Sequence, residues 1–349
     1  MSSERVYLDY NATTPISKPC KDSMIDAMSI VGNASSIHYE GRRVRSLIED
    51  AREKISSVLG ADPENLFFTS GASESASLLL KEQNCVCAKV EHPCVGAWCE
   101  KSLQVSKSGI IKIDDLKCST VQLANSETGI LQPSVRGLYM SDLVQAVGKI
   151  NFCFKTSGIR SGIISAHKFG GPQGIGAVVT EANFNFKPQV IGGGQEKGRR
   201  SGTENLIAIV GFGAAIEFAK TQLDDGIWEK TEELRNLFEE ELANRSQSTI
   251  FVGKGGERLP NTSCFITPGW TGQMQVMQMD LAGFSISAGS ACSSGKIRRN
   301  NTLVAMGFQP ELAECSVRIS LGTKTTKSDI QAFVRAWAQA EDDRNKRVA

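Results

Sequence analysis

The sequence predicts an α/β fold: a large domain with a mostly parallel sheet flanked by helices, followed by a smaller α+β C-terminal domain. Short apolar segments alternate with segments of helical periodicity through the first part of the chain, a pattern typical of parallel sheets. A long amphipathic segment then opens a second set of helices and strands. The length of 349 residues, with 40% hydrophobic and 22% charged residues, is sufficient for about two globular domains.

The chain begins with an extended arm, a helix and a strand. Residues 1–15 form the arm and end in NATTP, whose proline interrupts regular structure. Apolar residues recur at helical spacing over 44–59, and Gly60 stands where helices commonly end. Residues 65–69 predict a short strand, and the turn SGASES begins another helix near Ser73.

More short strands follow, and the connections between them are short. The expected strands are 85–90, 110–113, 119–124, 162–165 and 176–180. A right-handed crossover between parallel strands needs about a dozen residues or more. Between residues 80 and 165, however, a connection such as LQPSVRGLYMSD leaves room for a loop or a single helical turn.

The second half predicts two helices and two strands before a polar tail. The segment 205–220 reads as a helix, and apolar residues from Trp228 to Leu242 mark an amphipathic one. Strands are expected at 262–266 and 317–321, and the end, AEDDRNKRVA, is predicted to be a polar tail.

These elements divide the chain into three parts. We expect an N-terminal arm over 1–15, a large cofactor-binding domain over 16–220, and a small domain over 221–349. The small domain carries the glycine- and serine-rich loop around Cys292.

Charge and cysteine usage favour small-molecule partners in the cytoplasm. The 39 basic and 38 acidic residues leave a net charge of +1, so neither nucleic acid nor an acidic membrane is an expected partner. No apolar run of about 18 residues stands out, and MSSERVYLDY lacks the pattern of a signal peptide. The ten cysteines contain no CxxC pair, which favours free thiols in a reducing compartment.

The stretch SAHKFGGPQGIGAVV places Lys168 in a loop that leads into a buried strand. Lysine forms Schiff bases with carbonyl compounds, and pyridoxal 5'-phosphate is held in this way by its enzymes. Ser165 and His167 flank the lysine and are suited to hold a phosphate. Taken alone, Lys168 more often means a solvated loop charge, so the cofactor's other partners must be sought elsewhere in the chain.

Three residues match the needs of the cofactor ring. Asp142 follows an apolar run and is suited to pair with the pyridine nitrogen, and Gln145 is suited to donate to the phenolic oxygen. His92 follows a predicted strand, where an imidazole could stack on the ring and carry protons. The structural alternatives are a helix cap for Asp142, an exposed Gln145 and an ordinary loop histidine.

The phosphate would be held at the start of a helix. The backbone amides after Gly71, including that of Ala72, and the hydroxyl of Ser73 stand at a predicted helix N-terminus, which favours anions. Thr203 in RRSGTEN offers a further hydroxyl. Helix capping alone would also explain Ser73.

Two residues of the small domain match the needs of an amino-acid substrate. Cys292 lies among small residues that favour an accessible loop, as a catalytic thiol requires. Arg318 lies in the apolar segment ECSVRISLG, where its guanidinium needs a partner such as a substrate carboxylate. An incidental loop cysteine and an internal salt bridge are the alternatives.

In combination and in order, these motifs resemble the cysteine desulfurases of the class V aminotransferase group, pyridoxal phosphate enzymes of fold type I. The resemblance covers nearly the whole chain and rests on YLDYNATTP, SSIHYEGR, FFTSGASES, VEHPCV, ANSETG, DLVQAVGK, SAHKFGGPQGIG, GGGQEKGRRSGTEN, SAGSACSSG and VRISLG.

The resemblance implies a Schiff base on Lys168, a stacking His92, and partners for the ring nitrogen and phenolic oxygen in Asp142 and Gln145. It implies that L-cysteine becomes L-alanine while Cys292 receives a persulfide, which passes to a sulfur-acceptor or scaffold protein for iron–sulfur cluster or thio-cofactor synthesis.

The remaining implied roles concern the phosphate, the substrate and the assembly. The phosphate ligands implied by the family are Gly71, Ala72, Ser73, Ser165 and His167. Arg318 and Asn125 are implied to contact the substrate. Thr203 matches a threonine that reaches the phosphate of the neighbouring subunit, which implies a homodimer.

Two departures from the family pattern stand out. Ser126 in ANSETG occupies a position near the cofactor where the family has a second asparagine, and the chain is shortened between residues 80 and 165. The alternative functions are a selenocysteine lyase or another class V enzyme, and a degenerate scaffold subunit of a sulfur-transfer complex.

Overall fold

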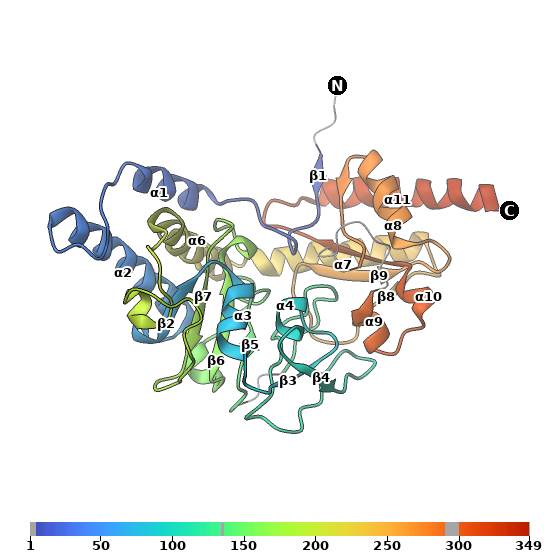
Figure 1. The fold of residues 1–349 in the computed structure, drawn as a ribbon. Helices are drawn as coiled ribbons and strands as arrows, with labels where there is room; N and C mark the ends of the chain where they lie inside the picture. The colour runs from blue at the N-terminus through green and yellow to red at the C-terminus, as the bar shows by residue number, and fades with distance from the viewer. Residues whose placement is uncertain (1–4, 134–135, 290–299, 349) are drawn as a thin grey trace.

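The computed structural model describes residues 5–133, 136–289 and 300–348, and in these the two expected domains lie side by side (Figure 1). Elements from the first part of the chain form the large domain, which carries helices on both faces of a central sheet. The small domain is built from the C-terminal elements together with the N-terminal strand β1 (Val6–Tyr7), which pairs with β10 (Phe284–Ser285). The domain limits themselves remain a prediction.

The sheet of the large domain is mostly parallel. Its hydrogen-bonded order is β2 (Leu66–Thr69), β7 (Gly176–Thr180), β6 (Ser161–Ser165) and β5 (Ser141–Asp142). β7 is antiparallel to both of its neighbours, whereas β5 and β6 are parallel. Parallel bridges continue the sheet through residues 119 and 120 to β3 (Val86–Ala88), which pairs in parallel with β4 (Glu100–Leu103).

Successive side chains along these strands point to opposite faces of the sheet, and both faces are buried. Phe68, Ile164 and Ala177 pack into one apolar cluster with helices α2 (Tyr39–Leu59) and α6 (Leu206–Asp224). Phe67 and Ile163 pack into a second cluster with α3 (Ala72–Leu80). Because both faces are covered, the strands are apolar throughout, as the sequence predicts for a buried sheet.

Short helices and turns complete the large domain. They are α1 (Lys18–Met28), η1 (Pro63–Asn65), α4 (Pro93–Gly96), α5 (Phe154–Ser157), η2 (Ala166–Lys168) and η3 (Gln195–Gly198). By length and composition α6 could span a membrane, but here it packs between α1 and α2 in the core. Its apolar character is therefore explained by burial within the domain.

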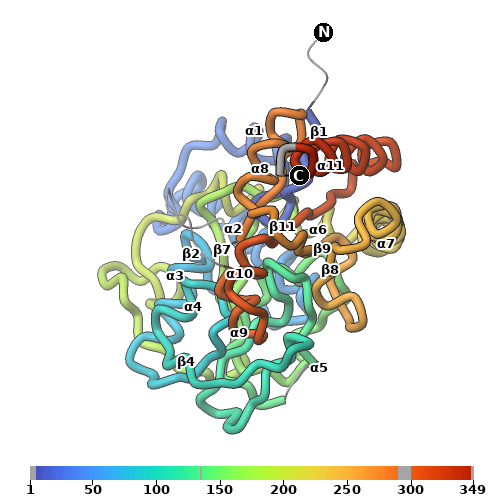
Figure 2. Tube along the Cα trace, turned by 90° about the vertical axis from the view of Figure 1, so that its right-hand side faces the viewer, coloured from blue at the N-terminus to red at the C-terminus, as the bar shows by residue number. Residues whose placement is uncertain are grey.

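The small domain places two long helices against a three-stranded sheet. The strand order is β11 (Ser316–Ser320), β9 (Thr262–Ile266) and β8 (Ile250–Phe251), all antiparallel. Helices α7 (Ile227–Arg245) and α11 (Lys327–Val348) lie side by side along it (Figure 2). The other helices are α8 (Gly272–Leu281), α9 (Asn301–Ala305) and α10 (Pro310–Ala313).

Three expectations about secondary structure are wrong. The segments 110–113 and 119–124 form isolated bridges rather than strands. The expected polar tail is helical, because Ile330, Phe333 and Trp337 anchor α11 in the core and its polar last turns continue from that anchor. The other expected strands and helices occur, with ends shifted by a few residues.

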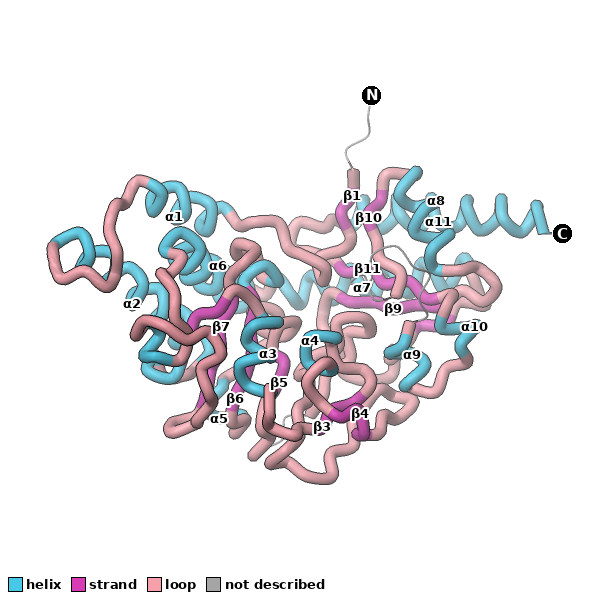
Figure 3. The backbone as a smooth tube through the Cα atoms, in the orientation of Figure 1, coloured by secondary structure: helices cyan, strands magenta, loops and turns pink. Residues whose placement is uncertain are grey.

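The segment between β4 and β5, where the sequence analysis places the shortening, is a long loop. Between β4 and β5 the described residues form no helix, and Figure 3 shows this stretch as loop. Gln132 holds it together, because its side chain accepts from Ile111 N at 2.9 Å and donates to Gly109 O at 2.8 Å. The loop packs with β9 in one apolar cluster that includes Ile130 and Cys264. Contacts with the small domain thus help to hold this loop.

A buried ion pair ties the glycine-rich segment at η3 to the large domain. The Glu196 carboxylate accepts from both terminal nitrogens of Arg52, at 2.9 and 3.0 Å, and from Phe68 N at 2.7 Å. Both charged side chains are about 5% exposed or less. Removing Glu196 would leave the buried Arg52 with only the half-exposed Glu49 as a charged partner, and would leave the Phe68 N–H without its acceptor.

We therefore predict that Glu196→Ala lowers the free energy of unfolding by about 3 kcal/mol. The matched control is Glu181→Ala, which removes the partly exposed Arg160–Glu181 pair and should cost about 1 kcal/mol or less. Denaturant unfolding of both variants measures the difference. Equal losses would show that the Arg52 pair contributes no more than a surface contact.

Candidate active site

The expected site residues surround a cavity of about 560 Å³ beside the sheet. It collects residues that follow β2, β3, β5 and β6, whose carboxyl ends meet at one edge because these strands run parallel. The small domain adds Arg318 from β11 and Thr302 from α9, and the N-terminal arm adds Asn11 and Ala12. The cavity is therefore formed by all three parts of the chain.

Lys168 ends the 3-10 turn η2 directly after β6, and its amine faces the arm. Nζ donates to the backbone oxygens of Asn11 and Ala12, at 2.8 and 2.9 Å. Thr14 Oγ1 in turn donates to Lys168 O at 3.0 Å. The arm thus positions the amine with neutral carbonyl groups.

Asp142 and Gln145 reach the same cavity from the end of β5. Asp142 is buried, and its Oδ1 accepts from Val144 N at 2.9 Å, so it caps a turn rather than a helix. Burial raises the pKa of the Asp142 carboxyl, while the nearby His92 and Lys168 lower it. Gln145 is also buried, contrary to the alternative of an exposed side chain, and its Nε2 donates to Asn11 O at 3.0 Å.

His92 is the N-cap of α4, and its environment selects one tautomer. Nδ1 accepts from Cys94 N at 3.2 Å and lies 2.9 Å from Cys94 Sγ. An acceptor Nδ1 leaves the proton of the neutral ring on Nε2. Both residues belong to the cavity wall.

The helix N-terminus predicted to bind phosphate borders the cavity as well. Gly71, Ala72 and Ser73 line it at the start of α3, where the first backbone N–H groups have no partner within the helix. The turn lies directly on β7: a Cβ atom at Gly176 would stand 2.8 Å from Gly71 Cα. Only glycine at position 176 permits this approach.

Ser165 and His167 complete this end of the cavity. Ser165 is buried at the end of β6, and His167 Nδ1 lies 3.2 Å from Thr13 Oγ1. Burial, helped by the charge of Lys168, lowers the pKa of His167 to about 4. The imidazole is therefore neutral near pH 7 and would meet an anion as a hydrogen-bond donor.

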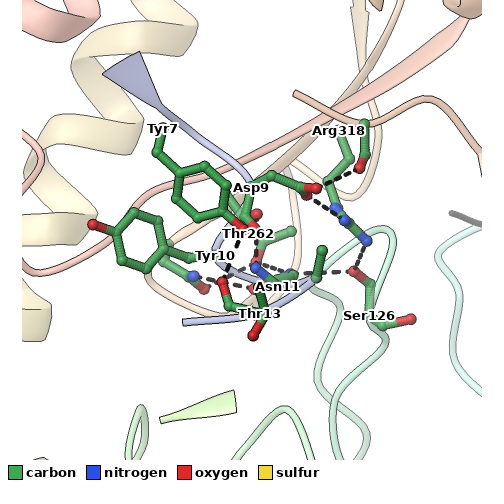
Figure 4. A network of polar contacts seen from close by, with 12 residues as sticks. Tyr7, Asp9, Tyr10, Asn11, Thr13, Ser126, Thr262 and Arg318 are labelled. Atoms are coloured by element: carbon green, nitrogen blue, oxygen red, sulfur yellow. Dashed lines mark hydrogen bonds and ion pairs between the residues drawn. The ribbon is translucent and has the colours of Figure 1, made fainter. Parts of the chain in front are cut away.

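Arg318 is held by Asp9 of the N-terminal arm and by the loop that contains Ser126 (Figure 4). Its Nη2 donates to Asp9 Oδ1 at 2.6 Å, and its Nη1 donates to the backbone oxygen of Ser126 at 3.0 Å. Ser287 Oγ donates to the other oxygen of Asp9 at 2.8 Å. The internal salt bridge weighed as an alternative does exist, yet Arg318 Nε is buried with no partner among the described residues.

Asn125 and Thr203 lie outside the wall of this cavity, whereas Ser126 is part of it. Asn125 Oδ1 accepts from the backbone of Glu127 and Thr128, and its Nδ2 donates to Val90 O at 3.1 Å, so it shapes the loop. Thr203 borders a separate cavity of about 180 Å³. Cys292 lies outside the described residues. The roles assigned to these residues stay predictions.

Sequence reasoning missed several polar residues at or beside the cavity, among them Asn11, Glu91, Glu127 and Lys149. Burial raises the pKa of Glu91 well above its usual range, and its Oε2 has no partner among the described residues. Glu91 precedes His92 after a predicted strand, and Asn11 begins NATTP. Their positions beside these motifs could have identified both residues as candidates for the site.

The fold and this site together are typical of enzymes that bind a carbonyl cofactor through a lysine. An α/β sheet presents a lysine amine, a buried carboxyl, an imidazole and a helix N-terminus to one cavity. That set of groups suits a phosphorylated carbonyl cofactor bound at the carboxyl edge of the sheet.

The chain belongs to the class-V aminotransferase family, whose sequence pattern matches residues 6–333. A relative from Dictyoglomus turgidum, called cysteine desulfurase IscS, is 36% identical and aligns with 93% of this chain and 91% of its own length. An IscS-like cysteine desulfurase from Mycobacterium tuberculosis is 33% identical, with 93% of each chain covered. The resemblance inferred from the motifs is thereby confirmed.

Solved structures agree with the family. The NifS-like protein from Rickettsia africae is 31% identical, covers 97% of this chain and 100% of its own, and superposes with a TM-score of 0.87. A protein solved as SspA in complex with cysteine is 27% identical with a TM-score of 0.76, covering 92% of this chain and all of its own. The α/β fold with a mostly parallel sheet is therefore confirmed.

The depressed pKa of His167 predicts a pH-dependent stability. Above about pH 6.5 the imidazole is neutral both folded and unfolded and contributes nothing. Between about pH 6.5 and about pH 4 the unfolded chain binds a proton that the folded chain does not, so stability falls as the pH falls. We expect His167→Gln to flatten this part of the unfolding curve of the cofactor-free protein. An unchanged difference between variant and parent from pH 7 to pH 4 would contradict the assignment.

Proposed function

We propose that the protein is a pyridoxal 5'-phosphate-dependent cysteine desulfurase. It converts L-cysteine to L-alanine: the carbon–sulfur bond of the substrate breaks, and its sulfur joins the Cys292 thiol as a persulfide. The observation that carries the proposal is the meeting of Lys168, Asp142 and Arg318 around one cavity. Relatives named cysteine desulfurase along the whole chain support it.

The residues of the cavity fit the cofactor. Lys168 offers an amine to its aldehyde, Asp142 a carboxyl to its ring nitrogen and Gln145 an amide N–H to its phenolic oxygen. The N-terminus of α3 with Ser73, and the pair Ser165 and His167, would hold its phosphate. When bound, the cofactor supplies an electron sink that makes the α-proton of an amino acid acidic.

His92 would both cover the ring and carry protons. Its Nδ1 is occupied by the Cys94 amide, so the nitrogen that can exchange protons with a ligand is Nε2. Charge interactions between His92 and both Asp142 and Glu91 are consistent with its position over the cofactor site.

Arg318 would bind the substrate carboxylate. Asp9 and the Ser126 oxygen each occupy one terminal nitrogen, which fixes the plane of the guanidinium. The unpartnered, buried Nε indicates that hydrogen-bonding capacity remains for a ligand. A carboxylate is the group whose geometry suits that fork.

The proposed assembly is a homodimer that delivers sulfur to an acceptor or scaffold protein in the cytoplasm. Thr203 lies with Arg200 on a smaller cavity that adjoins the Lys168 cavity at Ser70 and Gly174, and a role toward a second subunit is part of the proposal. All nine described cysteines are free thiols, as expected for a reducing compartment. The presence in one sequence of Lys168, Asp142, Gln145, His92 and Cys292 favours catalysis over a scaffold role.

The first test is the release of alanine and sulfide from L-cysteine by the cofactor-loaded protein under reductant. We expect turnover by the parent, loss of both products in Cys292→Ala, and loss of the visible colour of the cofactor in Lys168→Ala. Retained activity of Cys292→Ala toward selenocysteine alone would identify a selenocysteine lyase instead. Bound cofactor without any alanine, even with acceptor proteins added, would overturn the proposal in favour of a scaffold.

A second test addresses the substrate carboxylate. We predict that Arg318→Lys raises the KM for L-cysteine about tenfold or more, because a lysine cannot form the bidentate pair. Asp9→Asn should raise KM by less, since it removes only the residue that orients the guanidinium. Steady-state kinetics separates the two effects. A fall in kcat with KM unchanged in both variants would exclude carboxylate binding.

A further inference from the structure

Lys149 is the most deeply buried lysine beside the cavity, and none of the roles above uses it. It lies four residues after Gln145 in DLVQAVGK, and only 2% of its surface is exposed. Nζ donates to Gln145 Oε1 at 2.8 Å and to Asn11 Oδ1 at 3.0 Å. Both acceptors are neutral amides.

Among the described residues, the groups that contact the Lys149 amine are neutral and do not balance a positive charge on it. Within the described parts of the chain, no acidic side chain forms an ion pair with Lys149. Burial lowers the pKa of the Lys149 amine well below its usual range, and the positive charges of Lys168 and Arg318 lower it further. A buried lysine with this environment is costly, which calls for an explanation beyond packing.

The contacts of Lys149 determine which way the Gln145 amide faces. Gln145 Nε2 donates to Asn11 O at 3.0 Å, while its Oε1 receives the Lys149 amine. Rotating the amide by half a turn would set its oxygen against the carbonyl oxygen of Asn11 and would remove the acceptor to which the Lys149 amine donates. The two neighbours therefore select one orientation together.

Hydrogen bonds also hold the Asn11 side chain in one orientation. Asn11 can therefore fix the positions of Gln145 and Lys149. Its Nδ2 donates to Thr262 Oγ1 at 2.8 Å and to Ser126 O at 3.1 Å (Figure 4). Its Oδ1 also accepts from Asn261 Nδ2 at 3.1 Å. The amide of Asn11 cannot reverse without breaking contacts to the small domain and to the loop at Ser126.

We propose that Lys149 is a positioning residue that orients the Gln145 amide so that its remaining N–H, and not its oxygen, serves the cavity. Only an N–H donor can bond to the anionic phenolic oxygen that the proposed cofactor would place there. This inference rests on the proposed function for the identity of the ligand. The test therefore measures the affinity for the cofactor and its absorption spectrum, and neither measurement requires desulfurase turnover.

The experiment is a double-mutant cycle on the cofactor-loaded protein. Lys149→Met keeps an unbranched side chain, one atom shorter, and removes its donors, and Gln145→Ala removes the group that is oriented. We expect Lys149→Met to weaken pyridoxal 5'-phosphate binding by about five- to tenfold, the loss of roughly one hydrogen bond, and to shift the visible absorption band. In the Gln145→Ala background the same change should have little effect on either quantity.

Two further variants separate positioning from stability. Asn261→Leu removes a different donor to Asn11 Oδ1 without touching Gln145, and it should lower thermal stability while leaving the absorption band in place. Lys149→Gln, which restores an N–H donor, should partly recover the band if Lys149→Met proves too unstable. Additive effects of Lys149→Met and Gln145→Ala on cofactor affinity would overturn the proposal. Absence of any cofactor binding by the parent protein would instead overturn the proposed function.

Discussion

The hydrogen bonds of Asn11 are the contacts on which the rest of the site depends. Its side chain joins the small domain at Thr262 and Asn261, and its backbone oxygen accepts from both Lys168 and Gln145. A residue from the N-terminal arm thus sets the position of two groups at the far end of the large sheet. Because every partner is buried or half-buried, the loss of any one bond would leave a polar group without water to replace it.

The site is built from neutral acceptors at one end and charged pairs at the other. Carbonyl and amide oxygens surround the amines of Lys168 and Lys149, whereas Asp9 and the loop oxygen of Ser126 hold Arg318. A carboxylate beside Lys168 would favour its charged form, and a Schiff base requires the neutral amine as nucleophile. Asp142 lies near Lys168, whose charge lowers the pKa of that carboxyl, while Arg318 is suited to receive the anionic group of a substrate.

The long loop between β4 and β5 contributes to the stability of the large domain, whereas the cavity itself is formed by residues at the ends of the strands. Cavity residues lie at the ends of β2, β3, β5 and β6, and those strands are present although helices between β4 and β5 are absent from the described chain. The loop at residue 130 packs on the small-domain sheet instead, with Ile130 and Cys264 in one cluster. Ser126, which departs from the family pattern, contributes its backbone oxygen to Arg318, and a backbone oxygen is available from any residue.

The sequence alone determined the order of the elements and most of the chemistry. Apolar runs located β2, β6, β7 and β9, and the motifs around Lys168, Asp142, His92 and Arg318 identified a cofactor site, because these patterns depend on neighbours within a few residues. The strands at 110–113 and 119–124 were over-assigned, since a short apolar run also suits a loop buried beneath another domain. Only the tertiary structure brought Asn11, Asp9 and Lys149 to the site and left Asn125 in a turn. Their partners lie up to 309 positions away in the chain, and a contact made across such a separation leaves no local pattern from which it could be predicted.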